Sequence, residues 1–234
     1  MTADDLNQAL IAAAWRNDAD EAGRLIAQGA DVNAKDETVQ SAFLIATSEG
    51  FLSLLALTLE NGADIDSRDS FDGTGLIRAA ERGHALLVGM LLRQGIAVDH
   101  INNVGWTALL EAIILGDGGQ RYSDTVRVLL AGGADPFLPS QQDGISPMDH
   151  AQAQGFWTIA STLFAVINSE LPQDPIEALF HAASSNNVDG VMLALLAGAD
   201  PNVQNAGGDT ALAIAARAAY QDVSRLLHAF AGPI

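Results

Sequence analysis

The sequence contains no cysteine, which excludes disulfide bonds, zinc–thiolate sites and thiol nucleophiles. It also lacks long apolar runs, since stretches such as residues 85–92 are far too short to cross a bilayer. The first residues, Met1 to Asp5, have neither the basic region nor the apolar core of a signal peptide. These absences predict a cytoplasmic protein. The alternative is a periplasmic or exported protein from which a leader was removed.

Basic residues are scarce. The 234 residues include 11 Lys and Arg against 29 Asp and Glu, so the formal net charge is −18. A surface of this charge repels phosphate backbones and anionic lipids, so we expect neither a nucleic-acid partner nor a membrane partner. It would steer a basic protein partner towards the chain. The alternative is that the charge serves solubility alone.

A repeat with a period of 33 residues fills the chain. Equivalent positions follow one another at intervals of 33, 33, 33, 39, 31 and 33 residues: Gln8, Ser41, Thr74, Thr107, Ser146, Glu177 and Thr210. A glycine follows 21 residues later in most segments, and in the fourth it is delayed by five residues to Gly133. Such a period indicates a solenoid of stacked units. A single domain of seven units is predicted, at residues 4–36, 37–69, 70–102, 103–141, 142–172, 173–205 and 206–234.

Each unit is predicted to contain two short helices, which makes the fold all-α. Paired alanines allow the two helices to approach closely, and leucine pairs such as Leu91-Leu92 and Leu195-Leu196 supply the buried stripe of the second helix. The glycine after that helix can take the left-handed conformation at little cost. Because one unit cannot bury its own apolar side, neighbouring units are expected to stack into a continuous core.

The residues of the repeat resemble a known family. The third segment reads Gly73-Thr74-Gly75-Leu76-Ile77, Ala79-Ala80, Gly83-His84, Leu87-Val88, Leu91-Leu92 and Gly95, and the first and sixth contain Gly29-Ala30-Asp31-Val32-Asn33 and Gly198-Ala199-Asp200-Pro201-Asn202. This pattern is similar to the ankyrin repeat, although no segment has the complete Thr-Pro-Leu-His and the fifth lacks the Gly-Ala-Asp triplet. The resemblance implies an all-α solenoid with hairpin or loop fingers. It also implies a non-catalytic scaffold that binds a partner protein through the fingers and the concave helix face.

The fourth segment carries five extra residues around positions 117–122, and two adjacent glycines predict a flexible loop there. The resemblance places Trp106 on the finger of this unit, Ile114 and Leu115 on its concave face, and Phe71 on the neighbouring finger. Apolar residues at positions that are mostly polar elsewhere indicate a binding hot spot, to which the insertion adds Tyr122. The alternative is that the inserted loop folds over Ile114 and Leu115, while Trp106 packs against its neighbouring finger.

Arginines accompany this apolar set. The resemblance places Arg16, Arg78 and Arg82 on or next to the concave surface, where a guanidinium suits bidentate recognition of carboxylates. The alternative is charge balance with Glu81 and Glu49. A groove of mixed apolar and charged character would suit a protein or peptide partner.

Two irregularities concern the shape of the array. Residues 168–175 lose the finger signature and contain Pro172 and Pro175, so either the array kinks there or stacking continues across a shortened finger. In the last unit the first expected helix, in residues 210–217, stays apolar, and the second, in residues 222–230, is only partly polar, so end-to-end dimerisation is one alternative. We expect a monomer, because this end is capped by Arg217, Tyr220, Arg225 and His228.

Catalytic chemistry is not indicated. Nothing in the spacing places Ser, His and Asp as a nucleophile–base pair, and residues 116–119 lack the Lys and Ser/Thr of a phosphate-binding loop. The prediction is a non-enzyme without a cofactor. A metal site at His150 and His181, which occupy equivalent positions in adjacent units, is one alternative, although stacked helices about 8–10 Å apart are distant for shared coordination. Another is an inhibitor or immunity-type protein whose acidic surface blocks a basic target, with an affinity that collapses in salt.

Overall fold

The computed structural model describes residues 2–231, and all regular elements in that range are helices. Each predicted unit contains two of them, and residues 232–234 of the seventh unit lie outside the described range. The helices are α1 (Ala3–Trp15), α2 (Ala19–Ala27), α3 (Ala42–Glu49), α4 (Leu52–Glu60), α5 (Gly75–Glu81), α6 (Ala85–Arg93), α7 (Ala108–Ile114), α8 (Gln120–Ala131), α9 (Pro147–Ala153), α10 (Trp157–Asn168), α11 (Pro175–Ser184), α12 (Val188–Leu196), α13 (Ala211–Arg217) and α14 (Gln221–Phe230). No helix in the described part of the chain has the length and hydropathy of a bilayer-spanning segment.

The 33-residue period marks the starts of the first helices. In five units the recurring residue is the N-cap, whose hydroxyl accepts a hydrogen bond from the backbone N–H three positions later: Ser41, Thr74, Thr107, Ser146 and Thr210. This bond satisfies one of the free amide donors at a helix start. In the first and sixth units the helix begins earlier, with Thr2 and Asp174 as N-caps.

In five units a recurring glycine follows the end of the second helix. Gly29, Gly62, Gly95, Gly133 and Gly198 all have φ between 81° and 100°. Residues other than glycine rarely adopt this left-handed conformation, and it turns the chain out of the helix into the finger. Glycine at these positions therefore fixes where each finger begins.

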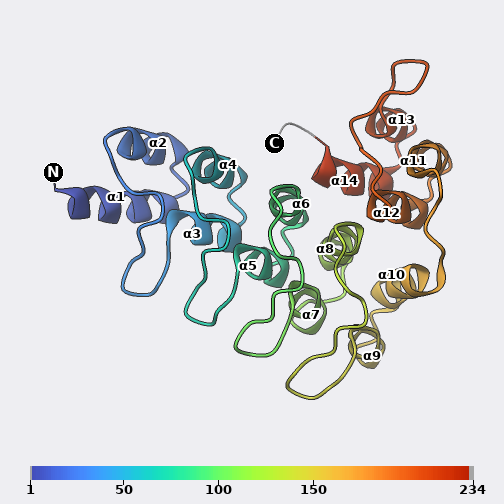
Figure 1. Cartoon of the computed structure of the whole chain (residues 1–234), viewed down its shortest axis with the longest axis horizontal. Coiled ribbons are helices and arrows are strands. Elements are labelled where there is room, and N and C mark those ends of the chain that lie inside the picture. Colours follow the sequence, from blue (N-terminus) through green and yellow to red (C-terminus); the bar gives the residue numbers. More distant parts are fainter. Residues whose placement is uncertain (1, 232–234) are drawn as a thin grey trace.

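The first ten helices stack in order. First helices pack on first helices from α1 to α9, second helices pack on second helices from α2 to α10, and the fingers after α2, α4, α6 and α8 extend on one side of the array (Figure 1). The core between the two rows is built from fully buried side chains, among them Phe43, Leu44, Leu54, Leu76, Leu109 and Leu129.

The stack changes direction after α10. The unit after residues 169–174 does not continue the row of first helices. Its first helix, α11, does not pack against α9 as the earlier first helices pack on one another. The helix α12 packs on α8 and also on α10, and α14 packs on both α6 and α8, so that the last two units lie back to back with the third and fourth (Figure 1). The two parts touch at the backbone, since a methyl group on Gly89 would overlap the carbonyl oxygen of Ala229.

Charged side chains join the same two parts. The Arg225 guanidinium donates to the Asp124 carboxylate at 2.7 Å, and Asp124 also lies 3.6 Å from Arg127 of its own helix. The apolar residues of α14, Val223, Leu226, Leu227 and Ala229, are buried within the molecule. Of the two helices on which the end-to-end dimer alternative rests, the second is therefore covered by the chain's own α6 and α8.

Candidate functional site

The surface made by the first helices and the fingers is called the groove face here. At the end of each first helix, two residues of this face stand seven and eight positions after the recurring residue of the unit: Trp15-Arg16, Ser48-Glu49, Glu81-Arg82 and Ile114-Leu115. Neighbouring rows are in contact, because Arg78 donates to the Ser48 hydroxyl at 3.1 Å and Arg82 lies 3.9 Å from the Glu49 carboxylate. The repeat thus sets residues 33 positions apart side by side along one surface.

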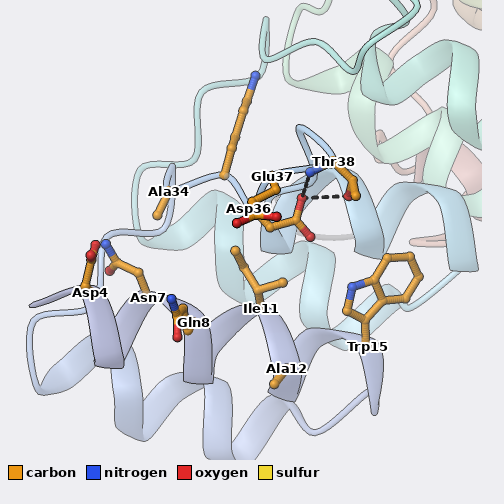
Figure 2. Close-up of a pocket in the computed structure, with 11 residues that line it drawn as sticks. Asp4, Asn7, Gln8, Ile11, Ala12, Trp15, Ala34, Asp36, Glu37 and Thr38 are labelled. Carbon is orange, nitrogen blue, oxygen red and sulfur yellow. Dashed lines mark hydrogen bonds between the residues drawn. The ribbon is translucent and has the colours of Figure 1, made fainter.

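The N-terminal end of the groove face is hollow. A cavity of about 540 Å³ lies between α1 and the first finger, with Ile11 and the half-exposed Trp15 on the helix side (Figure 2). On the finger side, the Asp36 carboxylate accepts from the Thr38 backbone N–H at 2.8 Å and from the Thr38 hydroxyl at 2.7 Å (Figure 2). These bonds close the finger into a turn. The cavity therefore has an apolar helix wall and an acidic finger wall.

Ion pairs occupy the middle of the groove face. Arg78 lies 3.5 Å from Asp69 and 3.4 Å from Glu81, and Arg82 lies 3.7 Å from Glu81. Asp69 is buried, and its carboxylate also accepts from the backbone N–H groups of Phe71 and Gly73, both at 2.8 Å. Arg78 thus helps to hold the second finger in place.

A buried carboxyl joins the third finger to α7. The Asn102 side chain donates to Glu111 at 2.6 Å, and its oxygen accepts from the backbone N–H of Val104 and of Trp106. Burial raises the pKa of Glu111 from 4.5 to about 7, and the hydrogen bond from Asn102 opposes this change. The Trp106 indole donates to the Ser140 hydroxyl of the next finger at 3.2 Å. Adjacent fingers are therefore linked through Trp106.

Comparison with known proteins gives the same repeat. The family "Ankyrin repeats (3 copies)" matches residues 43–140, and "Ankyrin repeats (many copies)" matches residues 179–228. An ankyrin repeat domain from Acinetobacter baumannii, solved by crystallography, is 46% identical over 67% of this chain and 80% of its own, with a TM-score of 0.65. The ankyrin repeat protein EF0377 is 35% identical over 67% of this chain and 78% of its own, with a TM-score of 0.63. No curated protein matches the sequence.

The chain belongs to the ankyrin-repeat family. The all-α solenoid that the sequence predicts is confirmed by these matches and by the helical architecture. Ankyrin repeats generally mediate protein–protein interaction, and the family is typically a non-enzymatic scaffold.

The ankyrin groove exposes only part of the predicted contact set. Phe71 on the second finger is 60% exposed and Leu115 at the end of α7 is 50% exposed. Trp106, Ile114 and Arg78 are partly buried, and the side chains of Arg78 and Trp106 are engaged within the chain by the bonds described above. Arg82 keeps 47% of its side chain exposed between Glu49 and Glu81. Both arginines lie beside the glutamates of the charge-balance alternative, and recognition of a partner's carboxylates stays a prediction.

Tyr122 requires a correction. Its side chain is only 6% exposed, and its hydroxyl donates to the Glu81 carbonyl at 3.1 Å. It thus fastens α8 to the end of α5 instead of facing a partner, because the helix that carries it lies against the preceding unit. We exclude Tyr122 from the candidate site.

The predicted flexible loop in the fourth ankyrin unit is also corrected. The connection between α7 and α8, residues 115–119, is two residues longer than residues 82–84 of the third unit, and the other three extra residues lengthen α8 to 12 residues, against 9 in α4 and α6. Arg121, in the first turn of α8, lies over the Tyr122 ring at 4.9 Å and against Gly83. Gly118 lies directly against the ring of Phe156 in the next unit. The insertion packs against both neighbouring units and leaves Leu115 exposed.

The two histidines are not brought together as the metal alternative requires. His150 lies 3.8 Å from Asp143, whereas His181 is exposed on α11, which does not stack on α9. Within residues 2–231 no group of three or more His, Asp or Glu side chains is arranged to hold a metal ion.

Trp15 is a groove residue that the sequence analysis missed. It stands at the same position of the ankyrin unit as Ile114, seven residues after the recurring position, and it lines the N-terminal cavity. Applying the repeat register to the first unit, as was done for the fourth, would have identified it. The groove face therefore has exposed apolar side chains at Trp15, Phe71 and Leu115.

Proposed function

We propose that this ankyrin-repeat protein is a scaffold that binds one partner protein along the groove face, centred on units two to four. The observation that carries the proposal is the exposure of Phe71 and Leu115 beside the half-exposed Arg82. Exposed apolar side chains next to an arginine are typical of interface hot spots. Because Arg78 and Trp106 are held by neighbouring units, they support the contact surface by fixing its shape.

The half-buried Trp106 and Ile114 have a defined role in this proposal. Trp106 holds the third finger against the fourth through Ser140, which sets the spacing of the surface that a partner meets. Ile114 precedes Leu115 at the end of α7, so that its burial orients the exposed leucine. A partner would contact Phe71, Leu115 and Arg82 directly, and the remaining predicted residues would act through the geometry of the groove.

The test is capture of the partner from the native cell lysate with matched surface variants. The double variant Phe71→Ser and Leu115→Ser removes two exposed apolar side chains of the groove face. The control, Leu52→Ser and Leu86→Ser, removes two exposed apolar side chains from the second-helix side. We expect a stoichiometric partner that the wild type and the control retain and the groove variant loses. Equal retention by all three, with unchanged helicity, would contradict the site.

A second candidate function follows from the charge of −18. An acidic inhibitor or immunity-type protein would block a basic active site or nucleic-acid site on its target. Its affinity would fall steeply between low and high salt, whereas an apolar hot spot would give a mild dependence. Washing the captured complex at both salt concentrations distinguishes the two. A partner that survives high salt supports the apolar groove, and one that is released supports electrostatic blocking.

A further inference from the structure

One face of α10 is apolar and uncovered. Trp157 is 68% exposed and Phe164 is 62% exposed. Trp157, Ser161 and Phe164 are spaced by four and then three residues, so their side chains lie on one side of the helix. Two exposed aromatic rings on one face of a single helix are unusual for a stable surface, and such patches mark interaction sites.

The repeat explains what this face does in the other units. Ser161 stands five residues after the N-cap of α10, as Gly23 does in α2. A methyl group on Gly23 would contact Leu57 of α4 at 3.7 Å, whereas Gly89, at the same position of α6, lies against Ala229 of α14. Phe164 stands eight residues after the N-cap, as Leu92 does in α6, and Leu92 packs against Gly132 at the end of α8. The end of this face at Phe164 therefore corresponds to a position that stacks on the next unit in α6.

After the change of direction, the aromatic part of this face has no cover. The helix α12 packs on α8 and also on α10, but it leaves Trp157 and Phe164 exposed. The segment that follows adds exposed Leu171 before α11 and Ile176 in its first turn. These exposed side chains leave an apolar surface on which one further helix could pack.

The acidic character of this part of the chain restricts which kind of helix could pack on the exposed face of α10. From residue 128 to residue 216 the chain has no Lys or Arg. Exposed acids precede and follow α10 in the sequence: Asp149, Glu170, Asp174 and Glu177. A second copy of the chain would bring another charge of −18 and the same acidic surroundings, so self-association is opposed by repulsion. A helix with basic residues beside its apolar stripe would be attracted.

We propose that the exposed face of α10, centred on Trp157 and Phe164, docks an amphipathic helix with basic flanks from a partner protein. The apolar stripe of this helix would lie on the two rings. Its Lys and Arg side chains would meet a part of the chain that has acids and no Lys or Arg of its own. This surface is separate from the groove face, and the proposal does not depend on groove binding.

The proposal is tested with a labelled synthetic peptide of leucine and lysine, about 18 residues or five helical turns long. Binding to the full chain is measured by fluorescence anisotropy. The variant Trp157→Ser with Phe164→Ser removes the two rings without a change of charge. The control variant Leu52→Ser with Leu86→Ser removes two exposed apolar side chains from other second helices, and Phe71→Ser with Leu115→Ser reports separately on the groove face. We expect at least about tenfold weaker binding to the α10 variant and unchanged binding to the control.

Three results would overturn the proposal. Equal binding to the α10 variant and the control would show that charge alone attracts the peptide, and weaker binding to the groove variant only would place the peptide on the groove face. Equal binding of a leucine–glutamate peptide with the same apolar stripe would remove the argument from charge. Sedimentation of the unliganded chain gives the remaining alternative: a dimer that the Trp157→Ser, Phe164→Ser variant abolishes would identify this face as a self-interface. Circular dichroism of each variant verifies that the helices are retained.

Discussion

Glu111 combines a titratable carboxyl group with almost complete burial. Its side chain has one hydrogen bond, from the Asn102 amide, and burial is the main cause of its raised pKa of about 7. The nearby carboxylates of Glu81 and Asp69 add to this increase, and the Arg78 guanidinium counteracts it. Glu111 thus takes up a proton near neutral pH, within the polar network that shapes the third finger.

This predicts a pH-dependent stability. An acid with a raised pKa in the folded state retains its full stabilising effect below the unfolded pKa of about 4.5 and loses it as the pH rises through about 7. The difference corresponds to about 3 kcal/mol. Because Glu111→Gln keeps an acceptor for Asn102 and does not titrate, its free energy of unfolding will fall less between about pH 5 and pH 8. Urea denaturation at several pH values measures this.

The control is Glu37→Gln, which removes an exposed carboxylate from the first finger. Its pH profile is expected to be parallel to that of the wild type. Parallel profiles for the wild type and Glu111→Gln would contradict the assignment of the pH dependence to Glu111.

At the residue scale, the sequence predicts local roles better than contacts. The Ser and Thr N-caps and the glycines at helix ends follow from the period, because their chemistry acts within a few residues. The burial of Tyr122 does not follow, because it depends on the end of α5, some 41 residues away in the chain. The engagement of Trp106 with Ser140 has the same origin, since it depends on how far apart two fingers lie.

At the scale of elements, the contact between α6 and α14 depends on a glycine in the middle of a helix. Alanine is more favourable than glycine in a helix by about 1 kcal/mol, so Gly89 has a reason other than helix formation. A methyl group there would overlap the backbone of Ala229, which has no flexible end to move aside. Gly89 allows the two helices to touch.

Gly89→Ala is therefore expected to destabilise the protein by about 1–3 kcal/mol despite its better helix propensity, because overpacking separates α14 from α6. The matched control is Gly23→Ala, which stands at the same position of the first unit, where the added methyl group would make an ordinary contact with Leu57 at 3.7 Å. That variant is expected to gain about 0.5–1 kcal/mol. Chemical denaturation of both variants decides, and stabilisation by Gly89→Ala would show that the helices do not touch.

At the scale of the whole molecule, the sequence predicts the units but does not choose between their arrangements. The period predicts helix pairs and the order of stacking through α10, because each interface repeats the one before it. The segment of residues 168–175 is compatible with either a kink or a short finger. The choice depends on whether the apolar side of α14 packs against α6 and α8, and a contact so distant in sequence leaves no periodic trace. The exposed face of α10 results from the same choice.

The fold-back makes the two ends of the array unequal. In an open solenoid each unit contacts only its neighbours, so both terminal units are expected to open most easily. Within residues 2–231 the helices of the first unit pack on those of the second alone, whereas α14 of the last unit also packs on α6 and α8 and is joined to Asp124 through Arg225. Amides of α14 can exchange only when those contacts open as well.

Hydrogen exchange measured by mass spectrometry should therefore show stronger protection in α14 than in α2. Gly89→Ala should reduce the protection of α14 to the level of α2 while leaving α2 unchanged. Equal and rapid exchange at both ends of the wild type would indicate an open array.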